Sequence, residues 1–102
     1  MSTLVQARQI DPGETRILAF DFGEKLADDQ LTGTPTTTVT PDDAPSFTIP
    51  APAQIAGRTI NVKMTAGNAA AGRDFVVKVS CATVNGLVLH MTATIEVREG
   101  AN

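Results

Sequence analysis

The stretch from Arg58 to Arg98 constrains the fold more than any other part of this chain. In three consecutive runs, apolar residues occupy every second position, which is the period of a half-buried β-strand. The sequence therefore predicts three consecutive antiparallel strands, a meander with one shared apolar face. The residues expected on that face are Ile60, Val62 and Met64, then Phe75, Val77, Val79 and Cys81, then Leu89, Met91, Ala93, Ile95 and Val97.

The links between these runs are rich in turn residues. Ala66–Gly72 is made mainly of small residues, and its glycines tolerate positive φ. Asn85-Gly86 separates the second and third runs. Asn-Gly favours a two-residue type I′ turn, because that turn needs φ > 0 at both central positions. The sequence thus predicts a tight hairpin between Phe75–Thr83 and Leu87–Arg98.

Shorter elements precede the meander. Glu14–Phe22 alternates and is predicted to be a strand, and Gly23–Gln30 is predicted to be a loop or one helical turn with Leu26 inward. Asp28 and Asp29 lack the staggered ligands of a calcium loop and are interpreted as solvated carboxylates. The inward positions expected in the strand are Leu18, Phe20 and Phe22.

The middle of the chain favours extended backbone without long helices. Leu31–Thr40 is rich in β-branched residues, and Pro35 removes one ladder donor, so an edge strand or a strand interrupted at Pro35 is expected. Ser46–Ile49 is predicted to be a short strand. Six or seven short strands with regularly spaced turns predict an all-β fold, an antiparallel immunoglobulin-like β-sandwich, with a small closed barrel as the alternative.

The chain is short enough for one domain. With 102 residues, it can bury roughly two-thirds of the surface that its unfolded form exposes. We expect residues 14–98 to form the sandwich and residues 99–102 a flexible tail. Residues 1–13 end in the turn signal Asp11-Pro12-Gly13 and are predicted to be an arm that reaches a neighbouring subunit. A frayed terminus or a covering edge strand is the alternative.

Charge and composition exclude several classes of protein. The net charge is −3, whereas a nucleic-acid module needs a basic face, so no nucleic-acid partner is expected. The N-terminus lacks the apolar core of a signal peptide, and no apolar run is long enough to span a membrane. We therefore expect synthesis in the cytoplasm and no membrane partner.

The residues that carry chemistry are sparse. Cys81 is expected to point inward as a small apolar side chain, and His90 outward, so the two cannot share a zinc site. No pairing of a nucleophile with a base is evident, and Gly67–Gly72 lacks the Lys and Ser or Thr of a phosphate loop. The sequence predicts no catalytic residue, no metal site and no cofactor, and hence no enzyme.

Because no chemical site is predicted, the function is expected to lie in the protein surface. Val76 and Val88 fall on the outward phase of adjacent strands, and Leu4, Val5 and Ile10 lie in the predicted arm. These five residues are the predicted protein-protein interface. The alternative is that Val76 and Val88 are scattered exposed apolar residues of no special significance.

The order of several short motifs resembles the fiber-tail adaptor proteins of tailed bacteriophages. These motifs extend over nearly the whole chain. They are Asp11-Pro12 with Glu14, Phe20-Asp21-Phe22, Thr36-Thr37-Thr38-Val39, Gly67 and Gly72 around a turn, and Ile95-Glu96-Val97-Arg98-Glu99.

This resemblance implies a structural virion protein that joins tail or neck components, works in several copies and assembles in the host cytoplasm. Its partners would be other virion proteins, including tail, neck or fiber components. The competing hypothesis is an immunoglobulin-like module that decorates the capsid or binds the host surface. Glycan binding is disfavoured, because all four Phe are assigned to the core or to strand starts.

Overall fold

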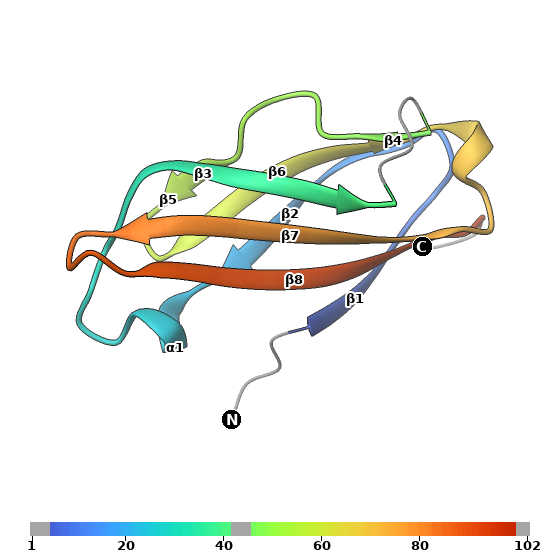
Figure 1. Cartoon of the computed structure of the whole chain (residues 1–102). Helices are drawn as coiled ribbons and strands as arrows, with labels where there is room; N and C mark the ends of the chain where they lie inside the picture. The colour runs from blue at the N-terminus through green and yellow to red at the C-terminus, as the bar shows by residue number, and fades with distance from the viewer. Residues whose placement is uncertain (1–4, 42–45, 100–102) are drawn as a thin grey trace.

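The computed structural model describes residues 5–41 and 46–99, and these residues form an all-β structure (Figure 1). The prediction of an all-β fold is confirmed. The elements in chain order are β1 (Val5–Ile10), β2 (Thr15–Asp21), α1 (Gly23–Leu26), β3 (Leu31–Thr40), β4 (Phe47–Thr48), β5 (Gln54–Ala56), β6 (Thr59–Ala66), the 3-10 turn Asn68–Ala70, β7 (Asp74–Thr83) and β8 (Val88–Val97).

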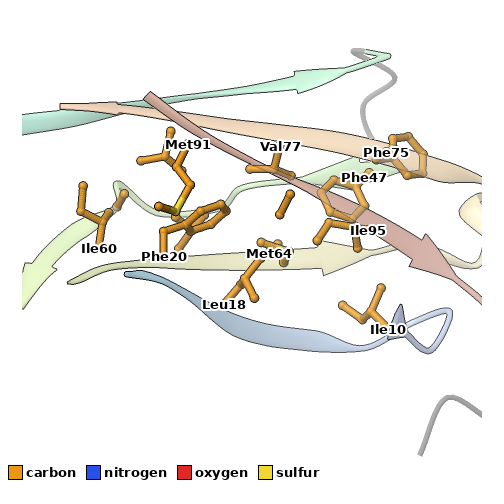
Figure 2. Close-up of a cluster of buried hydrophobic side chains, with 14 of the residues drawn as sticks. Ile10, Leu18, Phe20, Phe47, Ile60, Met64, Phe75, Val77, Met91 and Ile95 are labelled. Carbon is orange, nitrogen blue, oxygen red and sulfur yellow. The ribbon is translucent and has the colours of Figure 1, made fainter. Parts of the chain in front are cut away.

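The strands form two sheets. The first, sheet A, has the order β1-β8-β7-β3, and the second, sheet B, has the order β2-β6-β4, with β5 also paired to β6. All pairs are antiparallel except β1 with β8, which is parallel. The inward side chains of both sheets meet in one core (Figure 2).

The core is built from the predicted alternation. Of the residues expected to face inward from Arg58–Arg98, all are buried except Leu89, which is partly buried and packs against the core. Leu18, Phe20 and Phe22 are buried as predicted. Phe47 stacks on Phe75 across the two sheets, with ring centroids 4.7 Å apart. Aliphatic side chains and four Phe therefore suffice to fill this sandwich.

The predicted three-stranded meander is wrong in one respect. β7 and β8 form the expected hairpin, but β6 lies in the other sheet. The link after β6 contains a 3-10 turn, and the Gly67 N–H donates to Ser46 O, whereas the Gly72 N–H donates to Val97 O. This link therefore carries the chain from sheet B to sheet A. Alternation defines which face of a strand is buried, but it does not define the neighbouring strand.

Two predictions for the chain before β4 are confirmed. The segment after β2 contains one helical turn, α1, and Leu26 is buried. β3 is an edge strand of sheet A, and its register shifts between Thr32 and Thr36, on either side of Pro35. Pro35 thus sits where the ladder is irregular and no donor is needed.

The N-terminal segment includes a strand of the same domain. β1 pairs in parallel with β8, with Val5 opposite Thr92 and Ile10 opposite Val97. The Arg98 N–H donates to Ile10 O. In this structure, Val5–Ile10 is an edge strand of sheet A. A covering edge strand was one of the alternatives to the predicted arm.

Candidate interaction surface

The predicted interface residues do not come together on one surface. Leu4 lies outside the described residues. In the β1–β8 ladder, the backbone of Val5 lies opposite Thr92. Ile10 is only 2% exposed and belongs to the core, so in this structure it is a packing residue of its own domain.

Val76 and Val88 point outward from sheet A, as their phase predicts. Val76 is 39% exposed and Val88 is 61% exposed. In the β7–β8 ladder, Val76 pairs with Thr94, whereas Val88 pairs with Ala82. The two rows are six residues apart along β7, about 20 Å. Val76 and Val88 therefore cannot form a single small contact.

Val88 instead lies at the end of the hairpin, next to a turn that has two other exposed apolar residues. Val84 and Leu87 flank the turn and are 64% and 55% exposed. We call Val84, Leu87 and Val88 the apolar tip. Sequence reasoning missed Val84 and Leu87, although large apolar residues on both sides of Asn-Gly were a usable signal, since turns normally place polar residues there.

The turn itself differs from the predicted type I′. The ladder register pairs Ala82 with Val88, which leaves a longer connection than a two-residue loop. The Gly86 N–H donates to Thr83 O, and Gly86 alone in the turn has positive φ, at 88°. A type I turn followed by a left-handed glycine has this pattern. The hairpin is confirmed, but the predicted turn type is wrong.

Asp29 explains why this turn is favoured. Its Oδ1 accepts hydrogen bonds from the N–H groups of Gln30, at 2.8 Å, and Asn85, at 3.1 Å. The Val84 N–H donates to Gln30 O at 2.9 Å. The loop after α1 thus binds the turn directly, and the two lie at the same end of the molecule (Figure 1).

The interpretation of Asp29 as a solvated loop carboxylate is wrong. Asp29 is only 7% exposed, whereas Asp28 is exposed. A hydrogen bond from the Thr83 side chain and those from the Gln30 and Asn85 backbone lower the pKa of Asp29 below its ordinary 3.8, although desolvation acts in the opposite direction. The ionised carboxylate is therefore a structural part of the turn.

This lowered pKa predicts an acid-sensitive contribution to stability. The unfolded chain binds a proton at Asp29 at higher pH than the folded chain does, so stability falls as the pH drops from the ordinary Asp range toward the folded pKa. We expect the urea midpoint of the wild type to fall more between about pH 5 and about pH 3 than that of Asp29→Asn. Equal falls in the two proteins would contradict this role.

Ser80 and His90 make a contact that the sequence analysis did not foresee. They are cross-strand partners, and Ser80 Oγ lies 2.6 Å from His90 Nδ1 on the outer face of sheet A. The prediction that no hydroxyl pairs with a base is therefore wrong. Ser80 and His90 lie directly opposite each other in the β7–β8 ladder, which is the geometry of a cross-strand pair.

The remaining chemistry-bearing groups are dispersed. Cys81 is buried, and its thiol donates to Thr32 O at 3.4 Å. His90 lies on the opposite face of the sheet, as predicted. Within residues 5–41 and 46–99, no three His, Cys, Asp or Glu side chains are grouped to hold a metal ion. No helix of the described part is long and apolar enough to cross a membrane.

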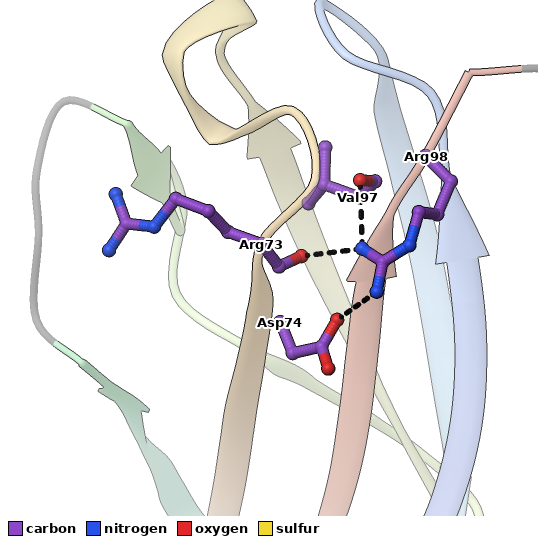
Figure 3. Close-up of polar contacts among 4 residues, drawn as sticks. All are labelled: Arg73, Asp74, Val97 and Arg98. Carbon is purple, nitrogen blue, oxygen red and sulfur yellow. Dashed lines mark hydrogen bonds and ion pairs between the residues drawn. The ribbon is translucent and has the colours of Figure 1, made fainter.

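The other end of the hairpin is closed by Arg98 (Figure 3). Its guanidinium donates to Arg73 O and Val97 O, and it pairs with the Asp74 carboxylate at 2.8 Å. Both charged side chains are more than a third exposed, so the ion pair itself contributes at most about 1 kcal/mol. Arg98 thus fastens the start of β7 to the end of β8, far from the apolar tip.

Comparison with known proteins supplies the family. A family model described as "Podophage GP4 fiber-tail adaptor protein gp77" matches residues 11–96, which is most of the chain. The matched region runs from Asp11, directly after β1, to Glu96, one residue before the end of β8. No curated protein matches the chain. Because the family match covers well over half of the sequence, this chain belongs to the podophage fiber-tail adaptor family.

Proposed function

We propose that this chain is a non-enzymatic structural virion protein that joins fiber and tail components through protein-protein contacts. The observation that carries this proposal is the family match over residues 11–96. Function then lies in surfaces rather than in a reactive site. The protein acts in the virion and assembles in the host cytoplasm.

We further propose that the scaffold is an immunoglobulin-like sandwich. In such folds, one sheet contains strands C, F and G and the other contains strands B, E and D. Here β3, β7 and β8 share one sheet, and β2, β6 and β4 share the other. The chain order of these strands supports the same assignment. This sandwich works as a rigid spacer that holds contact surfaces at its ends and edges.

Two regions supply the contacts in this proposal. One is the outer face of the β7–β8 hairpin, which exposes Val76 and Val88. The other is the N-terminal segment, whose strand β1 forms one edge of sheet A. An exposed strand edge can accept a strand from another chain. In the particle, several copies act together, with the edge that β1 forms in sheet A in contact with a neighbouring chain.

The experiment is deletion of the gene from the parent phage and purification of the resulting particles. We expect particles that lack fibers, and we expect purified wild-type chain to restore them, as counted by electron microscopy. Phe75→Ala protein, which lacks a core ring, is added in parallel. It shows whether restoring the fibers requires a stably folded chain. Gene-deleted particles with a full set of fibers would contradict the proposal.

A further inference from the structure

We propose that two copies of this chain join through β2 (Thr15–Asp21), by antiparallel pairing of one β2 with the other across a two-fold axis. The inference rests on the proposed function in one respect, because it names the contact through which copies act together. Three observations on the described residues carry it: the open edge of β2, the protection of the other strand edges, and the self-complementary order of the exposed side chains of β2.

The outer edge of β2 presents a row of backbone groups that face away from its own sheet. β2 is the end strand of sheet B, with β6 on one side and no described strand on the other (Figure 1). Just before and after β2, the Glu14 carbonyl accepts the Ala66 N–H and the Phe22 N–H donates to Arg58 O. Even-numbered residues therefore direct their N–H and C=O groups toward β6, and odd-numbered ones direct theirs to the open side. Such a row is a template for a further strand.

The edges on the other side of both sheets are protected against this pairing. In sheet A, β3 contains Pro35 and a register shift beside it. In sheet B, β4 has two residues and β5 has three, and Pro50 and Pro52 lie between them. Prolines, irregular strands and short strands are common means of preventing edge-to-edge association. These edges are therefore poor templates.

β2 lacks this protection. It has seven residues and contains no Pro, Gly or Lys. Its one basic side chain, Arg16, is directed to β1, where Nη1 donates to Gln9 O at 3.1 Å. The same hydrogen bond occupies an acceptor of β1, so β2 is the more open of these two neighbouring edges.

The exposed side chains of β2 complement themselves. Ile17 is 65% exposed, and Ala19 is exposed on the same outer face. When two β2 strands run antiparallel with Leu18 on the two-fold axis, each Ile17 lies opposite the Ala19 of the other copy. A large apolar side chain then packs beside a small one. No two charged residues lie directly opposite each other in the remaining pairs, which are Thr15–Asp21 and Arg16–Phe20.

A second copy is favoured over a strand of another protein because the pairing closes on itself. An isologous contact uses the same edge in both copies, so no β2 edge is left open. The interruption at Pro35 and the short β4 keep the opposite edges from continuing the sheet. The product is a closed dimer rather than a filament. Because Arg16 joins the edges of β2 and β1, this pairing also brings the β1 edge next to the other copy, as proposed above.

The hydrogen-bonding part is tested with Ala19→Pro in the full chain. The Ala19 N–H faces away from β6, so proline removes a donor of the open edge and no ladder hydrogen bond within the domain. Ala19→Ser is the matched control, because it keeps the N–H. The measurement is sedimentation equilibrium over a dilution series. We expect a reversible dimer for the wild type and Ala19→Ser, and a dissociation constant at least about tenfold higher for Ala19→Pro.

The side-chain part is tested with Ile17→Lys, which leaves the backbone of β2 unchanged. Lysine on an edge strand disfavours pairing with another strand, so we expect weaker dimerisation. Val76→Lys is the matched control, because Val76 is 39% exposed on β7, which lies between β8 and β3 and has no open edge. It should dimerise like the wild type. Thermal unfolding checks that each variant is folded.

The register is tested by oxidation of introduced cysteines. Mixing Ile17→Cys protein with Ala19→Cys protein places two thiols at directly opposite positions, with Cα atoms about 5.5 Å apart, a distance that a disulfide can span. In either protein alone, the two thiols are diagonal neighbours about 7–8 Å apart. We expect more cross-linked dimer from the mixture than from either protein alone. Cys81 is buried and serves as the background in the wild type. Equal cross-linking in all three samples would overturn the antiparallel register.

The outcomes separate this inference from the adaptor function. A wild type that is monomeric at every concentration, or variants Ala19→Pro and Ile17→Lys that dimerise like the wild type, would overturn the pairing and leave the adaptor function standing. A wild type that dimerises through β2 but does not restore fibers to gene-deleted particles would support the pairing and contradict the adaptor function. A monomeric wild type that binds these particles, with binding lost in Ala19→Pro and kept in Ala19→Ser, would overturn the second copy in favour of a strand from another virion protein.

Discussion

Replacing Phe75 by Ala is expected to lower the free energy of unfolding by about 3–5 kcal/mol, the range for truncating a buried aromatic ring. Phe75 is fully buried on β7. Its ring stacks on Phe47 of the other sheet, and the Arg73 guanidinium lies 4.9 Å from its centroid. The variant therefore loses an inter-sheet contact as well as apolar burial. The total free energy of unfolding of a small domain is about 5–15 kcal/mol. This single substitution therefore removes a large fraction of the stability.

Urea unfolding followed by circular dichroism measures this effect. The matched control is Ile17→Ala, which removes an apolar side chain that is 65% exposed and should change stability by no more than about 0.5 kcal/mol. A similar small change for Phe75→Ala would show that the two sheets do not pack as the structure has them.

Replacing Ile10 by Ala is expected to lower the free energy of unfolding by about 2–5 kcal/mol. Ile10 is 2% exposed, it lies opposite Val97 in the β1–β8 ladder, and its carbonyl accepts the Arg98 N–H. If β1 were a detached arm, its truncation would leave stability almost unchanged. The measurement is again the urea midpoint. The control is Gln9→Ala, a substitution of the neighbouring exposed residue.

This prediction also affects how the N-terminal segment is tested. Deleting residues 2–10 removes all of β1 and the buried Ile10 together. Loss of assembly after that deletion could follow from lost stability rather than from a lost contact. Substitutions on the surface of the folded domain separate the two causes.

Much of the fold could be predicted because the buried faces follow strict alternation. The inward set of β7 and β8 and the burial of Leu18, Phe20 and Leu26 follow from period and local propensity. The placement of β6 could not be predicted in this way. Whether β6 pairs with β7 or crosses to the other sheet depends on the 3-10 turn at Asn68–Ala70 and its long-range hydrogen bonds.

The surface was harder to predict, because it depends on contacts between distant residues. Asp29 is buried through its hydrogen bond to Asn85, 56 residues further along the chain. That contact accompanies the longer turn, and the turn brings Val84 and Leu87 to the end of the hairpin beside Val88. Likewise, the Ser80–His90 contact follows from the register of β7 with β8, which the predicted type I′ turn would have shifted by one residue.

The most direct test of the adaptor role is whether the purified chain holds fiber and tail proteins together. The measurement is size-exclusion chromatography with light scattering on the fiber protein and the tail protein of the parent phage, mixed with and without this chain. The adaptor role predicts a ternary complex that forms only when the chain is present. A fiber-tail complex that forms equally well without the chain, or a chain that binds neither protein, would contradict it.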